Sequence, residues 1–196
     1  MKELIIDAST NLLYIGLINE KEADYITRIG KNDNAAYVVE MIKDLLEKNN
    51  LKIDDIETII VGVGPGSYTG ARVAVTVAKM LAYTKNIKLK TISSLNLLST
   101  GYQNVLSAID ARRGYYFVGK FENGKTIMED DYLSFDEIKN EKNLIVITPE
   151  TIKVDLHLVS ENSILNENIH ELEPNYLRKT EAETNYDKKN DHKWYC

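Results

Sequence analysis

Residues 64–72, GPGSYTGAR, combine the residue types in this chain that are best suited to chemistry. Three glycines give the backbone freedom, and Ser67 and Thr69 add hydroxyl groups just before an apolar helical pattern. Backbone N–H groups at such a turn bind anions, phosphates above all. The same glycines can instead serve positive φ angles and close packing. The loop by itself leaves both interpretations open.

The loop fails the requirements of three better-known motifs. A Walker-type phosphate loop needs a lysine directly after its last glycine, and here the first lysine is Lys79. A dinucleotide-binding turn needs closer glycine spacing and an acid at the end of the next strand. A nucleophile elbow needs glycine two residues before the serine, where Ser67 has Pro65. A serine-histidine triad is therefore not predicted.

Two aspartates are the other candidates for chemistry. Asp7 and Asp110 each follow an apolar run within the triplet Ile-Asp-Ala, and Ser9 and Thr10 follow the first of them. Such residues could contact a phosphate-bearing ligand, with the acids holding its magnesium ion. Hydrogen bonding within the turn is the alternative for both acids. No set of histidines and acids has metal-ligand spacing, so no metal site is predicted.

The elements that must position these residues follow from hydrophobic periodicity. The first half predicts a β-β-β-α-β-α-β order. Its strands are expected at 3–8, 12–18, 24–29, 57–63 and 89–92, and its helices at 34–48 and 70–84.

An internal duplication organises the chain. Residues 6–22 align without a gap on residues 109–125, so that the Ile-Asp-Ala triplet and a later aromatic-branched-glycine triplet recur at one offset. The second half continues with a strand at 126–133, a helix at 134–140 and a strand at 143–148. We therefore predict a duplicated βββαβα fold of the actin-like (ASKHA) α/β class. Its lobes are expected at 1–100 and 101–179, the second shortened, before a polar, mobile tail at 180–196.

Composition limits the class of function. The formal net charge is −6 and the pI is about 5.2, which argues against independent, tight binding to nucleic acid. The one cysteine, Cys196, allows no internal disulfide. No apolar run approaches the ~20 residues of a membrane span. We expect a cytoplasmic protein with no membrane contact.

The helix predicted at 70–84 is apolar nearly all round, whereas a surface helix keeps one polar face. Either the chain buries it completely, or it shares a face with helix 34–48 and presents that face to another subunit. For the second case, the predicted interface residues are Val38, Ile42, Leu45, Val73, Val77, Met80 and Leu81.

Five segments resemble the bacterial TsaB (YeaZ) family: IIDAST, VGVGPGSYTGARV, ISSLNLLS, AIDARRGYYFV and, at 174–178, PNYLR. They occur in the family's order over most of the chain. The glycine loop is the most specific segment, and its family residues are Gly64, Pro65, Gly66, Ser67, Tyr68, Thr69, Gly70 and Arg72. One departure is Asp33-Asn34, where family members usually carry His-Ser.

The resemblance implies a non-catalytic subunit of the machinery that makes threonylcarbamoyladenosine beside the anticodon of tRNA. It implies pairing with the catalytic subunit TsaD and the ATPase TsaE, a homodimer when alone, and tRNA reached only through the complex. It implies no cofactor of its own beyond weak ATP or ADP with magnesium at a subunit junction. The alternative is an independent actin-like ATPase or small-molecule kinase that uses Asp7, Asp110 and the loop at 64–70.

Overall fold

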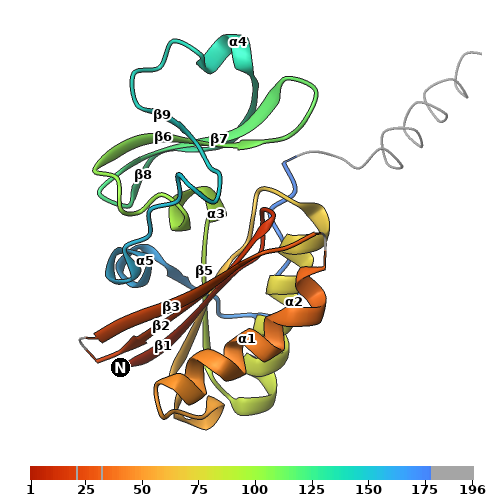
Figure 1. The fold of residues 1–196 in the computed structure, drawn as a ribbon, viewed down its shortest axis with the longest axis vertical. Coiled ribbons are helices and arrows are strands. Elements are labelled where there is room, and N and C mark those ends of the chain that lie inside the picture. The colour runs from red at the N-terminus through yellow and green to blue at the C-terminus, as the bar shows by residue number, and fades with distance from the viewer. Residues whose placement is uncertain (21, 32, 178–196) are drawn as a thin grey trace, which may run out of the picture.

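The computed structural model describes residues 1–20, 22–31 and 33–177. The predicted tail at 180–196 lies outside the described residues, and the division into lobes at residue 100 stays a prediction. Two β-sheets form the framework, one built mainly by each half of the chain (Figure 1). Within the described part of the chain, no helix is long and apolar enough to cross a bilayer.

The first sheet has the strand order β10-β5-β4-β1-β2-β3. Strands β1 to β3 form an antiparallel meander, while β4 and β5 add to β1 in parallel. The strands are β1 (Lys2–Asp7), β2 (Leu12–Asn19), β3 (Glu22–Ile29), β4 (Thr58–Gly62), β5 (Lys88–Ile92) and β10 (Ile164–Leu165).

Helices α1 (Asn34–Lys48) and α2 (Tyr68–Lys85) lie side by side on one face of this sheet (Figure 1). The short helices α3 (Ser94–Leu97) and α5 (Leu156–Asn162) pack into the core on the other face. Because both faces are covered, β4 is buried along its whole length, as its unbroken apolar run predicts.

The second sheet has the order β8-β7-β6-β9, which repeats the order β3-β2-β1-β4 of the first. Its strands are β6 (Asn104–Asp110), β7 (Tyr115–Glu122), β8 (Lys125–Ser134) and β9 (Leu144–Val146), with α4 (Phe135–Ile138) between the last two. The predicted duplication is thus present in the topology. The helix in the position of α1 is reduced to one turn, so α4 is the only helix that the described residues place on that face of the sheet.

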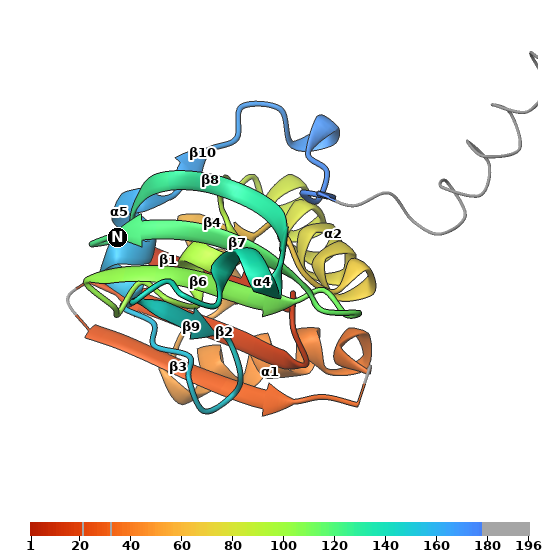
Figure 2. The same cartoon turned by 90° about the horizontal axis from the view of Figure 1, so that it is seen from above.

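A shared hydrophobic core joins the two sheets. Ile5, Tyr14 and Ile60 of the first sheet belong to the same buried cluster as Val105 and Phe121 of the second. Two 3₁₀ turns, η1 (Ile53–Asp55) and η2 (Ile169–Glu171), complete the fold. The segment after β10 runs past η2 beside α2, as Figure 2 shows from above.

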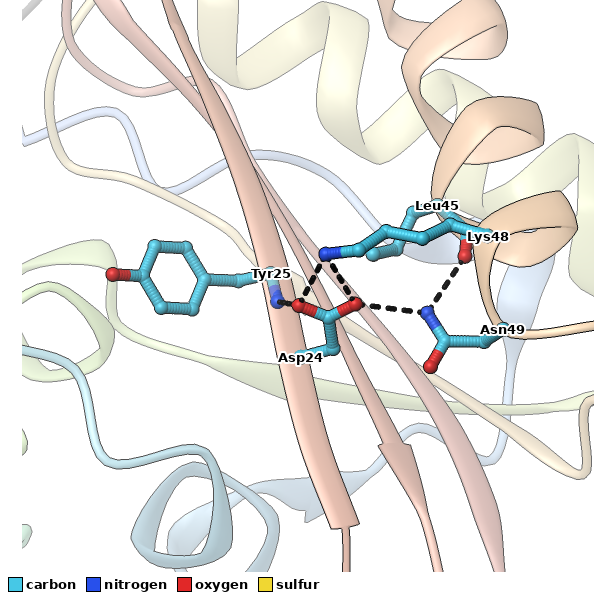
Figure 3. A network of polar contacts seen from close by, with 5 residues as sticks. All are labelled: Asp24, Tyr25, Leu45, Lys48 and Asn49. Atoms are coloured by element: carbon cyan, nitrogen blue, oxygen red, sulfur yellow. Dashed lines mark hydrogen bonds and ion pairs between the residues drawn. The ribbon is translucent and has the colours of Figure 1, made fainter.

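A polar network anchors the C-terminal end of α1 to β3 (Figure 3). The Asp24 carboxylate accepts hydrogen bonds from Lys48 Nζ at 2.9 Å and from Asn49 Nδ2 at 3.0 Å. The Asn49 amide also donates to the Leu45 carbonyl. The Lys48 ammonium, followed by the Asn49 amide, lowers the pKa of Asp24 below its usual value. The network fixes the helix that borders α2.

Candidate functional site

Helix α2 begins two residues earlier than its apolar pattern predicts, because Ser67 caps it. The Ser67 hydroxyl accepts a hydrogen bond from the Gly70 N–H at 3.2 Å. Tyr68 and Thr69 therefore belong to the first helical turn. At the other end, Asn86 in the left-handed conformation closes the helix.

The loop glycines allow the loop to lie directly against the β1–β2 hairpin. A Cβ atom on Gly70 would lie 1.8 Å from the Ala8 carbonyl oxygen, and one on Gly66 would lie 2.2 Å from the Ser9 carbonyl oxygen. The Ser67 N–H donates to that same Ser9 oxygen. Close packing is thus one function of these glycines, as expected from the alternative to anion binding.

Asp7 is fully buried and turned into the protein. Its Oδ1 accepts hydrogen bonds from the Ser9 N–H at 2.9 Å and the Ser9 hydroxyl at 2.8 Å, and its Oδ2 accepts one from the Ser94 hydroxyl. Burial raises the pKa of Asp7 despite these bonds. Glycine at position 62 leaves room for the Asp7 carboxylate, because a Cβ there would lie 1.9 Å from Asp7 Oδ2. These contacts match the hydrogen-bonding alternative for Asp7.

A cavity of about 930 Å³ lies between the two halves, beside the glycine loop. It is bordered by the N-terminal ends of α1 and α2 and by the equivalent hairpins after β1 and β6. The candidate residues Ser9, Thr10, Gly66, Ser67, Tyr68, Thr69, Gly70 and Asp110 line it, and Asp7, Gly64 and Pro65 are not among its lining residues.

Two arginines project from the hairpin after β6. Arg112 and Arg113 both line the cavity, and both adopt positive φ angles, 69° and 57°. Such angles are unfavourable for residues other than glycine and recur at functional sites. The Arg112 N–H donates to Asp110 Oδ1 at 2.7 Å. Two guanidinium groups, several hydroxyls and two helix N-termini favour an anionic ligand here.

The interface residues predicted on α1 need correction. Val38, Ile42 and Leu45 are 1%, 5% and 0% exposed, and they lie in the core between α1 and the first sheet. Their apolar stripe is covered by this chain itself, so their side chains do not reach the surface.

The residues predicted on α2 lie differently. Val73, Val77 and Leu81 are only partly buried against the core, and Met80 is 50% exposed. With the exposed Thr69 and Thr76 beside them, part of this side of α2 is left uncovered by residues 1–20, 22–31 and 33–177. We call Thr69, Val73, Thr76, Val77 and Met80 the free face of α2.

Sequence reasoning missed Asp130 on β8, a mostly buried carboxylate close to the cavity wall. It accepts hydrogen bonds from the Ser93 hydroxyl at 2.9 Å and from Asn175 Nδ2 at 3.4 Å. Burial raises its pKa to about 6. The alternating pattern of β8 did not mark Asp130 as a site residue, because the hydrogen-bond partners of Asp130 come from distant parts of the chain.

Replacing Asp130 by asparagine is expected to stabilise the protein above pH 6. The raised pKa means that the folded chain binds this proton more tightly than the unfolded chain does. The resulting stabilisation is therefore present near pH 4 and is lost as pH rises through about 6. We expect the Tm of Asp130→Asn to exceed wild type by about 2–4 °C at pH 7.5. Thermal unfolding from pH 4 to 8 tests this, and equal Tm values at pH 7.5 would contradict it.

Among the described residues, no group of three or more histidines, cysteines and acids is placed to hold a metal ion.

The duplicated sheets and the cavity between them define the actin-like class of α/β proteins. In agreement, a family model described as "TsaD: tRNA N6-adenosine threonylcarbamoyltransferase" matches residues 29–155. The chain belongs to this family, and within it to the TsaB (YeaZ) proteins.

Individual relatives support this assignment. The chain is 36% identical over 135 residues to the Bacillus subtilis protein named "tRNA threonylcarbamoyladenosine biosynthesis protein TsaB", covering 66% of this chain and 58% of that protein. It is 28% identical over 133 residues to the Escherichia coli protein of the same name, covering 63% and 58%. The chain thus matches less than two thirds of the length of these relatives.

A solved structure titled "YeaZ from Pseudomonas aeruginosa" has the same fold. It superposes with a TM-score of 0.72 at 19% identity, covering 90% of this chain and 99% of that chain.

Proposed function

We propose that this chain is a non-catalytic scaffold subunit of the machinery that makes threonylcarbamoyladenosine in tRNA. The names of its relatives indicate the pathway. The free face of α2 is the single structural observation that supports a scaffold, because the described residues leave this side of the helix, with two threonines, two partly buried valines and the half-exposed Met80, partly uncovered.

The proposed partner of this face is a TsaD-like catalytic subunit. Thr69, Val73, Thr76 and Met80 follow each other at spacings of four, three and four residues, so they share one side of the helix. Helix α1 adds Val39, which is 56% exposed. A helix-on-helix contact of this kind also accounts for a homodimer when the catalytic subunit is absent. In this proposal a TsaE-like ATPase joins the pair, and tRNA is reached through the complex.

The cavity between the halves is the proposed place of a weakly bound phosphate compound, ATP or ADP with magnesium. Arg112 and Arg113, with the Ser67 and Thr69 hydroxyls, would contact its phosphates. Asp7 would not hold the magnesium ion, because both of its oxygens are already engaged inside the protein. The independent ATPase or kinase, which would use both acids, is left with Asp110 alone at the cavity, and Asp110 Oδ1 already accepts the Arg112 N–H at 2.7 Å.

Two measurements test the proposal. On mixing with the TsaD-like subunit of the same organism, sedimentation velocity is expected to show a one-to-one complex. The chain alone is expected to show no magnesium-dependent ATP hydrolysis above background. Hydrolysis that disappears in Asp7→Asn, together with no complex, would favour the ATPase instead.

A further inference from the structure

Residues 173–177, which we call the clasp, join parts of the molecule that are far apart in the sequence. Asn175, Tyr176 and Leu177 all line the cavity between the two halves. Just upstream, Lys79 Nζ donates to the His170 and Leu172 carbonyls at 3.0 and 2.9 Å. The segment leading to the clasp is thus held along α2 independently of the clasp itself.

The clasp is attached to α2 through Tyr176. Arg72 Nε donates to the Tyr176 hydroxyl at 2.6 Å, although the two residues are 104 positions apart. The Tyr176 ring lies 4.8 Å from the Tyr68 ring, and the Arg72 guanidinium lies 4.2 Å from the centre of that second ring. Two of the segments that carry the family resemblance, the glycine loop and PNYLR, therefore contact each other directly.

Asn175 attaches the clasp to both sheets. Its backbone N–H donates to the carbonyl of Val63, which follows β4, at 2.7 Å. Its side-chain amide donates to Asp130 on β8 at 3.4 Å. The Asn175 carbonyl also lies 3.3 Å from where a Gly64 Cβ would be, so glycine leaves the clasp room against the loop. The clasp thus spans the gap between the sheets at the cavity.

Leu177 packs against the shared core, but the aromatic attachment of the clasp lies close to solvent. Tyr176 is 38% exposed and Tyr68 is 41% exposed, whereas the neighbouring strand β4 is buried throughout. One backbone hydrogen bond, that of Asn175 to Val63, links the clasp to the first sheet. Segments held in this way open at a much lower free energy than the core does.

We propose that the clasp is the movable wall of the cavity, and that its opening controls how a ligand enters and how firmly the glycine loop is held. The role in ligand access rests on the proposed phosphate compound. The role in holding the loop does not, because it follows from the contacts of Tyr176 and Asn175 alone.

Hydrogen–deuterium exchange at neutral pH tests the clasp in Tyr176→Ala. Loss of the ring and hydroxyl is expected to speed amide exchange at least tenfold both in residues 173–177 and in the loop peptide 62–72. Tyr25→Ala is the matched control, since Tyr25 is also an exposed tyrosine, 57% accessible and stacked on Tyr14 at 5.5 Å, but belongs to β3. It is expected to leave both peptides unchanged.

Faster exchange in 173–177 with an unchanged loop peptide would overturn the proposal, because the segment would then be only a surface attachment. Unchanged exchange in both peptides would overturn it as well. Should Tyr176→Ala fail to fold, Tyr176→Phe removes only the hydroxyl that Arg72 binds, and the same two peptides are expected to respond more weakly.

Binding of a fluorescent ATP analogue tests the role of the clasp in ligand access separately from its role in holding the loop. Association and dissociation are both expected to become at least threefold faster in Tyr176→Ala. If wild-type protein binds no analogue, the proposed phosphate ligand is wrong. The exchange experiment then still decides whether the clasp holds the glycine loop. Binding with unchanged rates in Tyr176→Ala would show that the clasp is not the route of entry.

Discussion

Replacing Gly70 by alanine is expected to lower the stability of the protein by about 3 kcal/mol, or roughly 6–12 °C in Tm. In an open helix the same change stabilises, by about 1 kcal/mol. Here the new Cβ would lie 1.8 Å from the Ala8 carbonyl oxygen, a backbone atom that cannot move without shifting the β1–β2 hairpin. Helix α2 must therefore move away from the hairpin, or the hairpin must bend.

Thermal and urea unfolding measure this effect, with Gly114→Ala as the control. Gly114 has a φ of 77° but nothing within 4 Å of its Cβ position, so it suffers only the backbone penalty of about 1–2 kcal/mol. A neutral or stabilising Gly70→Ala would show that α2 is not held against the hairpin. Our explanation of the glycine loop would then be wrong.

Two glutamate substitutions, one on α1 and one on α2, are expected to distinguish a core position from a position in the proposed interface. Ile42→Glu places a charge at a position that is 5% exposed inside the core, and should cost at least about 4 kcal/mol and leave the chain largely unfolded. Met80→Glu changes a side chain that is already 50% exposed, and should alter the stability of the isolated chain by less than about 1 kcal/mol.

Circular dichroism reports folding, and sedimentation velocity reports pairing with the TsaD-like subunit. Met80→Glu is expected to remain folded and to lose at least a hundredfold in affinity for the partner, since binding would bury an unpaired charge. A folded Ile42→Glu would contradict the core assignment. A folded Met80→Glu that pairs normally would exclude Met80 from the interface.

The secondary structure could be predicted well where a single element carries its own pattern. Helix α1 occupies the predicted residues 34–48, because its apolar side chains recur at helical spacing between polar ends. Strand β2 spans Leu12–Asn19 and strand β7 spans Tyr115–Glu122. The two strands are separated in the sequence by the same number of residues as the two Ile-Asp-Ala triplets. Their shared pattern therefore predicted the repeated topology of the two sheets.

The exposed side of each helix could be predicted only in part, because periodicity shows which side of a helix is apolar but not what covers it. On α1 the apolar stripe of Val38, Ile42 and Leu45 is covered by the helix's own sheet. On α2 the small residues Ala74 and Ala78 face the sheet, and Met80 is left outside. Hydrophobicity alone does not distinguish these two cases.

The clasp could not be predicted from sequence spacing. Its contacts join Tyr176 to Arg72 and Asn175 to Asp130, and pairs so distant in the chain have no local periodicity to reveal them. The available signal was that GPGSYTGAR and PNYLR both carry the family resemblance, which does not show that they touch. Only the folded chain places them together.

We propose that this chain supports threonylcarbamoyladenosine formation through the free face of α2. Nucleoside mass spectrometry of tRNA from cells depleted of the protein tests it most directly. We predict that the modified nucleoside is lost, that wild-type protein restores it, and that Met80→Glu, expressed at the same level, does not. An unchanged level of threonylcarbamoyladenosine in depleted cells would contradict the proposed function, and full restoration by Met80→Glu would contradict the proposed interface.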